Sequence, residues 1–405
     1  MIKRTTKKKL YNASKKIMRK SIIFTLFFTT GMSLFAIVPG YHGARSLSLG
    51  YASSALNSDI NAIFLNPALL TAIKSGLTGY QYQNSYLDYR DFTADLSAVL
   101  EYDLKNFETL PGTEKGELLS KLHDLFQSKS GMYGFSSSVP GFVSRGYGIS
   151  ISVVKTAIID PAASDIFSKG AANISNSDIA SLKLDFLGLS YKQVSLAYAL
   201  PFSQGIHLGI GLHYLDGKVT EFDAAIIDNI FTPDTGTRNY LEFCWGEANN
   251  KFSKLVMDVG FGVNFGLHFN VGLRLKNIGA AKIKTPVREI ALDKRITAGL
   301  AFTPEPQWGI YLDMDITSAD LLYSGEKIQP LSLGVEKGFF NNKFFMRAGF
   351  LTDLTEKYFI GRKSNSLYGM GFGFNLGYFV VDFGLGIAGD GSVDSLAVSG
   401  FFVLK

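Results

Sequence analysis

The chain has 405 residues, of which 40 are basic, 35 are acidic and one is a cysteine, Cys244. A single cysteine excludes an internal disulfide. Nine of the basic residues lie in the first 36 positions, so the remaining chain has 31 basic against 35 acidic residues, and it has no basic stripe that would bind nucleic acid. The 42 glycines, 33 phenylalanines and 19 tyrosines are typical of an all-β chain with crowded interior positions and an apolar exterior.

The first 36 residues have the pattern of a secretory signal peptide. Their basic residues precede an apolar run at 21–35, and no acidic residue interrupts them. The apolar core at 22–28 is too short to favour a permanent spanning helix. We predict cleavage after Ala36, although a compact signal peptide beginning at Met18 is equally compatible with the pattern.

Residues 37–76 differ from everything that follows, because they mix helix and turn signals and lack strand-like alternation. Pro67 favours an extended or turn conformation at Asn66. From the residues alone, a turn that caps a helix is as good an interpretation as a specialised segment.

A family resemblance changes that balance. The sequences GARSL at 43–47, DINAIF at 59–64 and NPA at 66–68, together with Gly50, resemble the N-terminal hatch of the FadL-like long-chain fatty-acid transporters, and most of all their spirochaete (Treponema-type) branch. The sequence KNIG at 276–279 also resembles a turn in FadL-like relatives that include the type IX secretion barrel. The resemblance implies that residues 37–76 are a hatch that plugs a transmembrane barrel formed by residues 77–405.

Strict alternation of apolar with small or polar residues fills the chain after residue 77. It is clearest in MDVGFGVNF at 257–265 and FNVGLRLK at 269–276, and it predicts strands with one apolar face. A soluble β-sandwich would also alternate. However, the polar face here consists mainly of Gly, Ser, Asp and Asn, and the strands are about nine residues long, as in a lipid-facing barrel.

We therefore predict an all-β transmembrane antiparallel barrel. Between 14 and 17 strands can be recognised, a single-chain barrel needs an even number, and the hatch family has 14. Such a barrel would lie in the bacterial outer membrane, with outer-membrane lipid and the barrel-assembly machinery as its partners, and we expect it to be a monomer.

Three polar, irregular stretches predict long loops, at 157–181, 216–252 and 277–293. Between Thr113 and Lys129, leucines at helical spacing predict a short amphipathic helix. We interpret this helix as a loop element packed on the barrel rim, in preference to a helix that binds a partner.

No group of residues predicts catalysis, so we expect no enzyme activity, no catalytic residue, no cofactor and no metal site. The five histidines have no metal-ligand spacing. Four residues of the hatch motif are apolar enough to help line a pocket for a hydrophobic ligand: Phe64, Leu65, Leu69 and Leu70, which flank the further candidates Asn66 and Pro67. Anchoring of the plug to the wall is the role that we favour for each of them.

Basic residues on inward-facing strand positions are the second group of candidate ligand contacts. Arg274 and Arg347, with Lys276, could bind the carboxylate head group of a fatty acid. The alternative is pairing inside the lumen with one of four acidic residues, which are Asp258, Asp313, Asp315 and Asp382.

The resemblance implies uptake of hydrophobic small molecules such as long-chain fatty acids, by diffusion past a hatch. The ligand would leave through a small movement of the hatch or a lateral gap in the wall. A second interpretation has no transport: an outer-membrane scaffold or shuttle for secreted proteins, or a surface-exposed protein whose long loops meet a host.

Overall fold

The computed structural model describes residues 43–404, except for gaps at 56–59, 89–95, 97, 127–130, 163, 165, 170–172, 228–249, 280–281, 286–288, 293, 321–326, 356–365, 390 and 392. The predicted signal peptide, its cleavage site and Cys244 lie outside the described residues.

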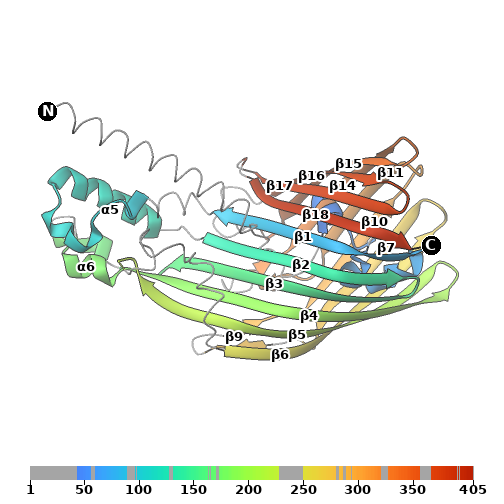
Figure 1. Ribbon diagram of the computed structural model, residues 1–405, viewed down its shortest axis with the longest axis horizontal. Helices are drawn as coiled ribbons and strands as arrows, with labels where there is room; N and C mark the ends of the chain where they lie inside the picture. The colour runs from blue at the N-terminus through green and yellow to red at the C-terminus, as the bar shows by residue number, and fades with distance from the viewer. Residues whose placement is uncertain are drawn as a thin grey trace.

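Fourteen antiparallel strands close into one barrel, in which each strand pairs with its neighbours along the chain and β1 pairs with β18 (Figure 1). This confirms the predicted fold class and strand number. The wall consists of β1 (Gly76–Asp88), β2 (Gly131–Ser144), β3 (Tyr147–Pro161), β4 (Lys183–Ser203), β5 (Ile206–Ala225), β6 (Asn250–Phe265), β7 (Phe269–Ile278), β10 (Arg295–Phe302), β11 (Trp308–Asp315), β14 (Pro330–Phe339), β15 (Phe344–Asp353), β16 (Ser366–Asn375), β17 (Phe379–Ala388) and β18 (Val393–Leu404).

Alternation along the strands places apolar side chains outside and small or polar side chains inside. On β11, Ile310, Leu312 and Met314 are exposed, whereas Asp313 is buried. Phe372 on β16 leaves 43% of its surface exposed. A band of apolar side chains therefore faces outward, as a lipid-facing surface requires.

The two ends of the barrel differ. One end has short turns, several of which contain a glycine with positive φ, as at Gly205 and Gly377. The first residue of β1, Gly76, pairs there with Leu404 at the end of β18, so the wall begins and ends at the short-turn end (Figure 1). The longer connections lie at the opposite, long-loop end, where two small hairpins form: β8 (Lys282–Lys284) with β9 (Glu289–Ala291), and β12 (Ala319–Asp320) with β13 (Lys327–Ile328).

Strand length varies strongly around the wall: β4 has 21 residues and β5 has 20, whereas β10 and β11 have eight each. The predicted loops at 157–181 and 216–252 are wrong where long strands continue into them: residues 157–161 belong to β3 and residues 216–225 to β5. The β4–β5 ladder continues from Ser203 and Ile206 to Lys183 and Ala225, so residues 216–225 belong to a strand. Their polar composition resembles that of a loop because this part of the sheet extends beyond the apolar band into solvent.

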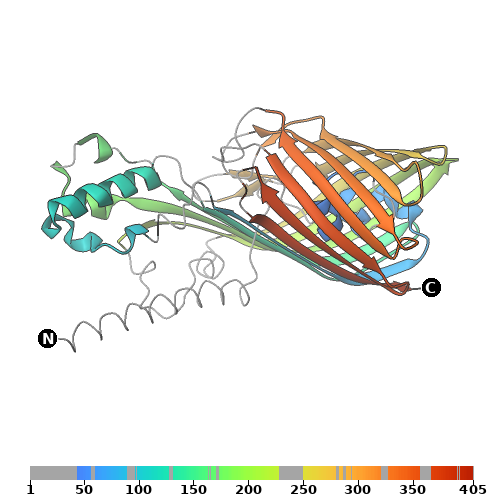
Figure 2. The ribbon, with the colours of Figure 1, turned by 90° about the horizontal axis from the view of Figure 1, so that it is seen from above.

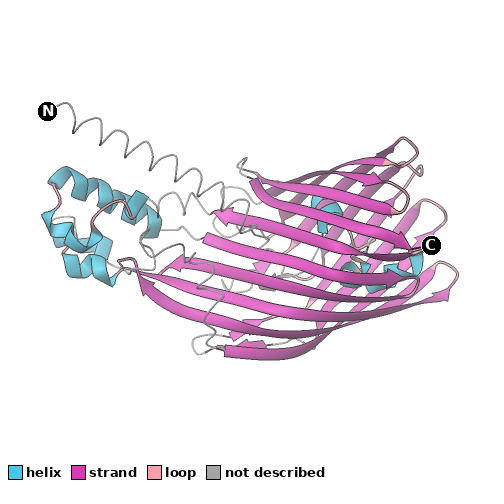
Figure 3. Cartoon of the chain, in the orientation of Figure 1, coloured by secondary structure: helices cyan, strands magenta, loops and turns pink. Residues whose placement is uncertain are grey.

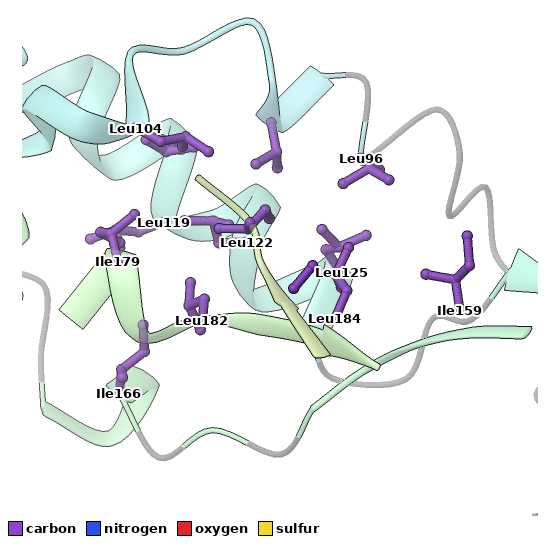
Figure 4. Packing of buried hydrophobic residues seen from close by; sticks show 14 of the residues in the cluster. Leu96, Leu104, Leu119, Leu122, Leu125, Ile159, Ile166, Ile179, Leu182 and Leu184 are labelled. Atoms are coloured by element: carbon purple, nitrogen blue, oxygen red, sulfur yellow. The ribbon is translucent and has the colours of Figure 1, made fainter. Parts of the chain in front are cut away.

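A helical subdomain caps the extended strands (Figures 1 and 2). It contains η3 (Leu104–Thr109), α5 (Gly112–Phe126), η4 (Ile166–Lys169) and α6 (Asn176–Ser181). Their apolar side chains form one buried cluster with the outer parts of β3, β4 and β5 (Figure 4). The amphipathic helix is confirmed as α5, but it packs in this cluster at the ends of the long strands and not on the barrel rim.

Strands dominate the described chain, and the remaining helices are short (Figure 3). Among the residues that the structure describes, no helix combines the length and apolar character needed to cross a membrane.

Candidate functional site

The candidate site is the lumen and the hatch inside it. The hatch consists of α2 (Gly43–Ser48), α3 (Ala62–Leu65) and η1 (Pro67–Ala72), and its helices lie within the ring of strands (Figure 2). Helix α2 contacts β15–β18 and β1, whereas η1 contacts β3–β6 on the other side of the lumen. The segment therefore reaches across the lumen from wall to wall.

Glycines on the inner wall allow the hatch backbone to approach the strands closely. They stand in register on neighbouring strands: Gly334, Gly349 and Gly369 pair in sequence across β14, β15 and β16. A Cβ at Gly334 would lie 2.7 Å from the carbonyl oxygen of Leu49, a distance that real Cβ atoms do not show. We call this set the glycine row, defined by positions whose Cβ would collide with hatch backbone: Gly209, Gly260, Gly272, Gly334, Gly349, Gly369 and Gly384.

Asn66 links the hatch to itself and to the wall. Its amide nitrogen donates to the carbonyl oxygen of Ser54 at 2.8 Å and to that of Phe261 on β6 at 3.2 Å. Its amide oxygen accepts from the backbone N–H of Ala68 at 3.1 Å and so caps η1. The side chain is fully buried, which confirms the expectation that this amide ties the hatch to the wall.

A buried ion cluster holds α2 against β14, β15 and β17. Arg45 of the hatch donates from Nε and Nη2 to both carboxylate oxygens of Glu336, at 3.0 and 2.8 Å. Arg347 donates from Nε to Glu336 at 2.5 Å and from Nη1 to Asp382 at 2.6 Å. We call these four residues the ion quartet. Its two guanidinium groups balance its two carboxylates, so the charges can be buried together.

Arg274 on β7 contacts the hatch backbone. Its Nη1 donates to the carbonyl oxygen of Leu65 at 2.7 Å, and its Nη2 donates to Thr297 at 3.2 Å. Nearby, Asp313 on β11 accepts the backbone N–H groups of Ser53 and Ser54. Both predicted arginines are thus in the lumen, but they lie on different strands. Arg274 binds the hatch backbone, whereas Arg347 binds the wall residues Glu336 and Asp382.

The remaining predicted site residues lie within the hatch. Phe64, Leu65 and Leu69 are buried. Phe64 and Leu69 pack with apolar residues of β1, β2, β4 and β18. Pro67 lies against Gly209 and Gly260 of the wall. Their role as ligand contacts stays a prediction.

The lumen between the hatch and the long-loop end is apolar on one side. Inner faces of β3–β6 form a buried cluster that includes Leu189, Leu215 and Val256, and the β8–β9 hairpin inserts Ile283 and Ile290 into it. Below this cluster, a small cavity of about 30 Å³ reaches Phe64 of the hatch.

A polar group forms part of the same cavity wall. His213 lies 3.5 Å from Asp258 through its Nε2, and its Nδ1 is 2.9 Å from the Ser195 hydroxyl. The Phe64 ring stacks against His213, with ring centroids 6.3 Å apart. The cavity can therefore offer apolar contact together with a few polar atoms.

Several residues that fix this site are not evident from the sequence. Glu336 lies in the ordinary-looking stretch GVEKGF, yet it bridges both arginines of the ion quartet. Gln83 on β1 accepts the backbone N–H of Gly43, and Ser399 on β18 accepts that of Ala44. The alternating pattern of the sequence places these residues on the inward face of their strands. It does not indicate which residue each side chain contacts inside the lumen.

Comparison with solved structures finds several with the same barrel. The Ralstonia pickettii toluene transporter TbuX superposes with a TM-score of 0.55 at 12% identity, over 91% of this chain and 99% of that one. A deltaS2 mutant of the TodX monoaromatic hydrocarbon channel gives 0.54 at 12% identity, over 91% and 100%. The Pseudomonas putida toluene transporter TodX gives 0.50 at 10% identity, over 91% and 97%.

The chain shares its fold with these channels. At such low identity the likeness establishes the fold and not the ligand. No protein-family model matches the sequence, and comparison with curated proteins finds no match.

Proposed function

We propose that this protein takes up hydrophobic small molecules across the bacterial outer membrane, by diffusion through its hatch-plugged barrel. The observation that carries the proposal is an apolar cluster inside the lumen that ends on a tightly fitted hatch. An aqueous pore for ions or sugars would need a polar, open path, whereas a buried apolar cluster suits a ligand that leaves water.

The proposed orientation follows from the barrel ends. Short turns of outer-membrane barrels face the periplasm and longer loops face outward. The helical subdomain and the β8–β9 hairpin would then lie on the outside, and the hatch-to-β1 connection at Ile73 would lie near the periplasm. A ligand would enter among the long loops and rest beside Leu215, Val256 and Phe64.

A lateral exit is supported by irregular pairing in the wall beside the hatch. Register shifts occur between Gly79 and Gln81 in the β1–β2 ladder and between Val139 and Phe142 in the β2–β3 ladder. Pro140 lies within the second shift and has no N–H to donate to a ladder. Two irregular ladders therefore lie on the side that the apolar face of the hatch contacts through Val143. Register shifts also occur in the β4–β5, β6–β7 and β17–β18 ladders.

The class of hydrophobic ligand and the branch of the transporter family are also matters of proposal. Fold relatives are named for toluene and monoaromatic hydrocarbons, whereas the hatch motif resembles long-chain fatty-acid transporters, above all the spirochaete branch. Arg274 and Arg347 would contact a carboxylate only after giving up bonds to the hatch or to the ion quartet. Toluene-sized ligands and fatty acids are therefore both to be tested.

The helical subdomain favours a second candidate function. It lies at the far end of strands that extend beyond the lipid-facing band, where it could meet another protein. A surface or scaffold role would need this subdomain and no passage through the lumen.

Uptake into proteoliposomes separates the two functions. We expect radiolabelled toluene, oleate or both to enter vesicles faster with the protein than without it, while labelled glucose does not. The pair Val256→Trp and Val259→Trp provides a matched test on β6, because Val256 faces the apolar cluster and Val259 faces outward. Uptake should fall with Val256→Trp and persist with Val259→Trp.

Absence of uptake for both hydrophobic solutes by a correctly inserted protein would contradict the transport proposal. Insertion is checked for each variant by heat-modifiable migration on gels, so a failure to assemble is not mistaken for a blocked path.

A further inference from the structure

A second cavity, of about 320 Å³, lies on the other side of the hatch from the apolar cluster. Its wall includes Leu77 on β1, Val380 on β17 and Val403 on β18. Each of these positions is within one residue of the short-turn end of its strand. The cavity therefore lies at the short-turn end of the lumen, where the hatch leads into β1.

The cavity is mainly apolar along the wall. Val403 pairs with Leu77 across the β1–β18 ladder, and Val380 pairs with Phe401 across the β17–β18 ladder. These four side chains form a continuous apolar surface opposite Ile73 of the hatch. Such a surface would bind the chain of an apolar or amphipathic molecule.

Charged residues form much of the remaining lining, together with Ser75, Phe345 and Asn375, and the positive and negative charges do not balance. All four members of the ion quartet contribute, and Lys74 of the hatch-to-β1 connection is added to them. Three basic groups (Arg45, Arg347 and Lys74) thus stand against two acidic groups (Glu336 and Asp382), a formal charge of +1. The side chain of Arg45 leaves 17% of its surface exposed, and Lys74 is exposed.

We propose that this cavity binds an anionic amphiphile with a single apolar chain. Its head group would meet the positive charge of Arg45 and Lys74, and its chain would lie along Leu77, Val380 and Val403. The volume is at the lower end of the ~300–1,000 Å³ typical of ligand pockets, so the site fits a short or medium chain. The proposal concerns binding at the short-turn end and does not require passage through the lumen.

The test uses octanoate as the probe and the full chain in nanodiscs of zwitterionic lipid, with isothermal titration calorimetry corrected for partition into empty nanodiscs. We expect saturable octanoate binding, and weaker binding or none for octylamine, which has the same chain and a cationic head. Octanol should bind less tightly than octanoate, because it lacks the charge. Equal affinity for the three probes would overturn the proposal of an anion site.

Adjacent residues on β18 provide matched variants. Val403→Trp fills the cavity and should lower octanoate affinity by about 5- to 150-fold, the range expected for overpacking. Leu404→Trp changes the next residue, whose side chain faces lipid, and should leave affinity unchanged. Lys74→Gln should weaken binding by about 1.4- to 5-fold in low salt, as for an exposed ion pair.

Val256→Trp distinguishes this site from the proposed uptake path. If Val256→Trp abolishes octanoate binding and Val403→Trp does not, the probe lies in the upper lumen and the short-turn site is refuted, while the uptake proposal stands. If Val403→Trp abolishes binding and uptake of hydrophobic solutes is absent, the short-turn site stands without transport.

Discussion

A methyl group added to the glycine row should displace the hatch without preventing barrel assembly. Gly349 pairs with Gly334 and Gly369, and a Cβ at this position would collide with the hatch backbone at Leu49 and Gly50. Overpacking of a closely fitted interior costs about 1–3 kcal/mol. The described residues of the hatch pair with no strand of the wall and lie inside it, so the cost falls on hatch docking.

The consequence is a measurable leak. A loss of about 1–3 kcal/mol from hatch docking raises the fraction of unplugged barrels by about 5- to 150-fold. Single-channel recordings in planar bilayers should show rare or no openings in the parent protein and frequent openings in Gly349→Ala. Gly400→Ala is the matched control, because a Cβ there meets a side chain, Phe379, at an ordinary 3.4 Å. If Gly349→Ala conducts no more than Gly400→Ala, the hatch is not held against the wall as the structure shows.

Three further outcomes are expected. Asn66→Ala leaves buried carbonyl groups unsatisfied and should weaken hatch docking by about 1–3 kcal/mol. The same recordings should then show more openings, while heat-modifiable migration on gels stays unchanged; unchanged conductance would contradict this prediction. Phe372→Asp on the lipid face should cost about 2–4 kcal/mol if the site is near the midplane, measured by urea titration in vesicles, whereas Gly262→Asp should act on the hatch instead; equal tolerance would mean that the faces are reversed. In the helical subdomain, pairing with Lys169 lowers the pKa of Asp178 to about 2. The stabilisation of the folded subdomain by this carboxylate is therefore complete above the unfolded pKa of about 3.9 and is lost as pH falls through about 2. Circular dichroism should show this acid-induced loss of helix in the parent protein and not in Asp178→Asn.

Much of the wall was predictable because a strand has a period of two. The alternation in MDVGFGVNF at 257–265 assigned Gly262 to the interior, and the structure places it there beside Ala68 of the hatch. The hairpin turn at Gly377 was likewise predictable from glycine between two alternating runs, and it has a positive φ. The alternation of apolar and polar residues was sufficient to predict the orientation of side chains wherever one face of a strand faces lipid.

The extended strands and the helical subdomain were not predictable in the same way. Residues 216–225 carry Asp216, Lys218 and Asp223 because their part of the sheet lies beyond the apolar band, and polarity was interpreted as a loop. The position of α5 depends on a buried cluster that its leucines share with Ile159 and Leu184, which are distant in sequence. Hydrophobic spacing predicts that a helix has a buried face, but not which surface covers it.

The inner surface illustrates a second limit. The sequence predicts that Gly334, Gly349 and Gly369 are small residues on the inward face. That they allow the hatch backbone to approach the wall depends on the register of three strands and on the position of the hatch, which the sequence does not show. Glu336 binds Arg45 across 291 positions of sequence. Such pairs follow from closure of the barrel, and no local pattern contains them.

The two sides of the hatch are held by different interactions, and this bears on how a ligand could pass. On the α2 side, moving the hatch would separate Arg45 from Glu336 and leave buried charge uncompensated, at about 3–5 kcal/mol. On the η1 side, Leu69 and Leu70 pack against apolar wall residues such as Val143. A hydrophobic ligand can replace apolar contacts as it displaces them, but it cannot replace an ion pair. In the proposed uptake, the least costly passage therefore runs along Leu69 and Leu70 beside Val143, where it leaves in place the ion quartet and the wall hydrogen bonds of Asn66 and Arg274.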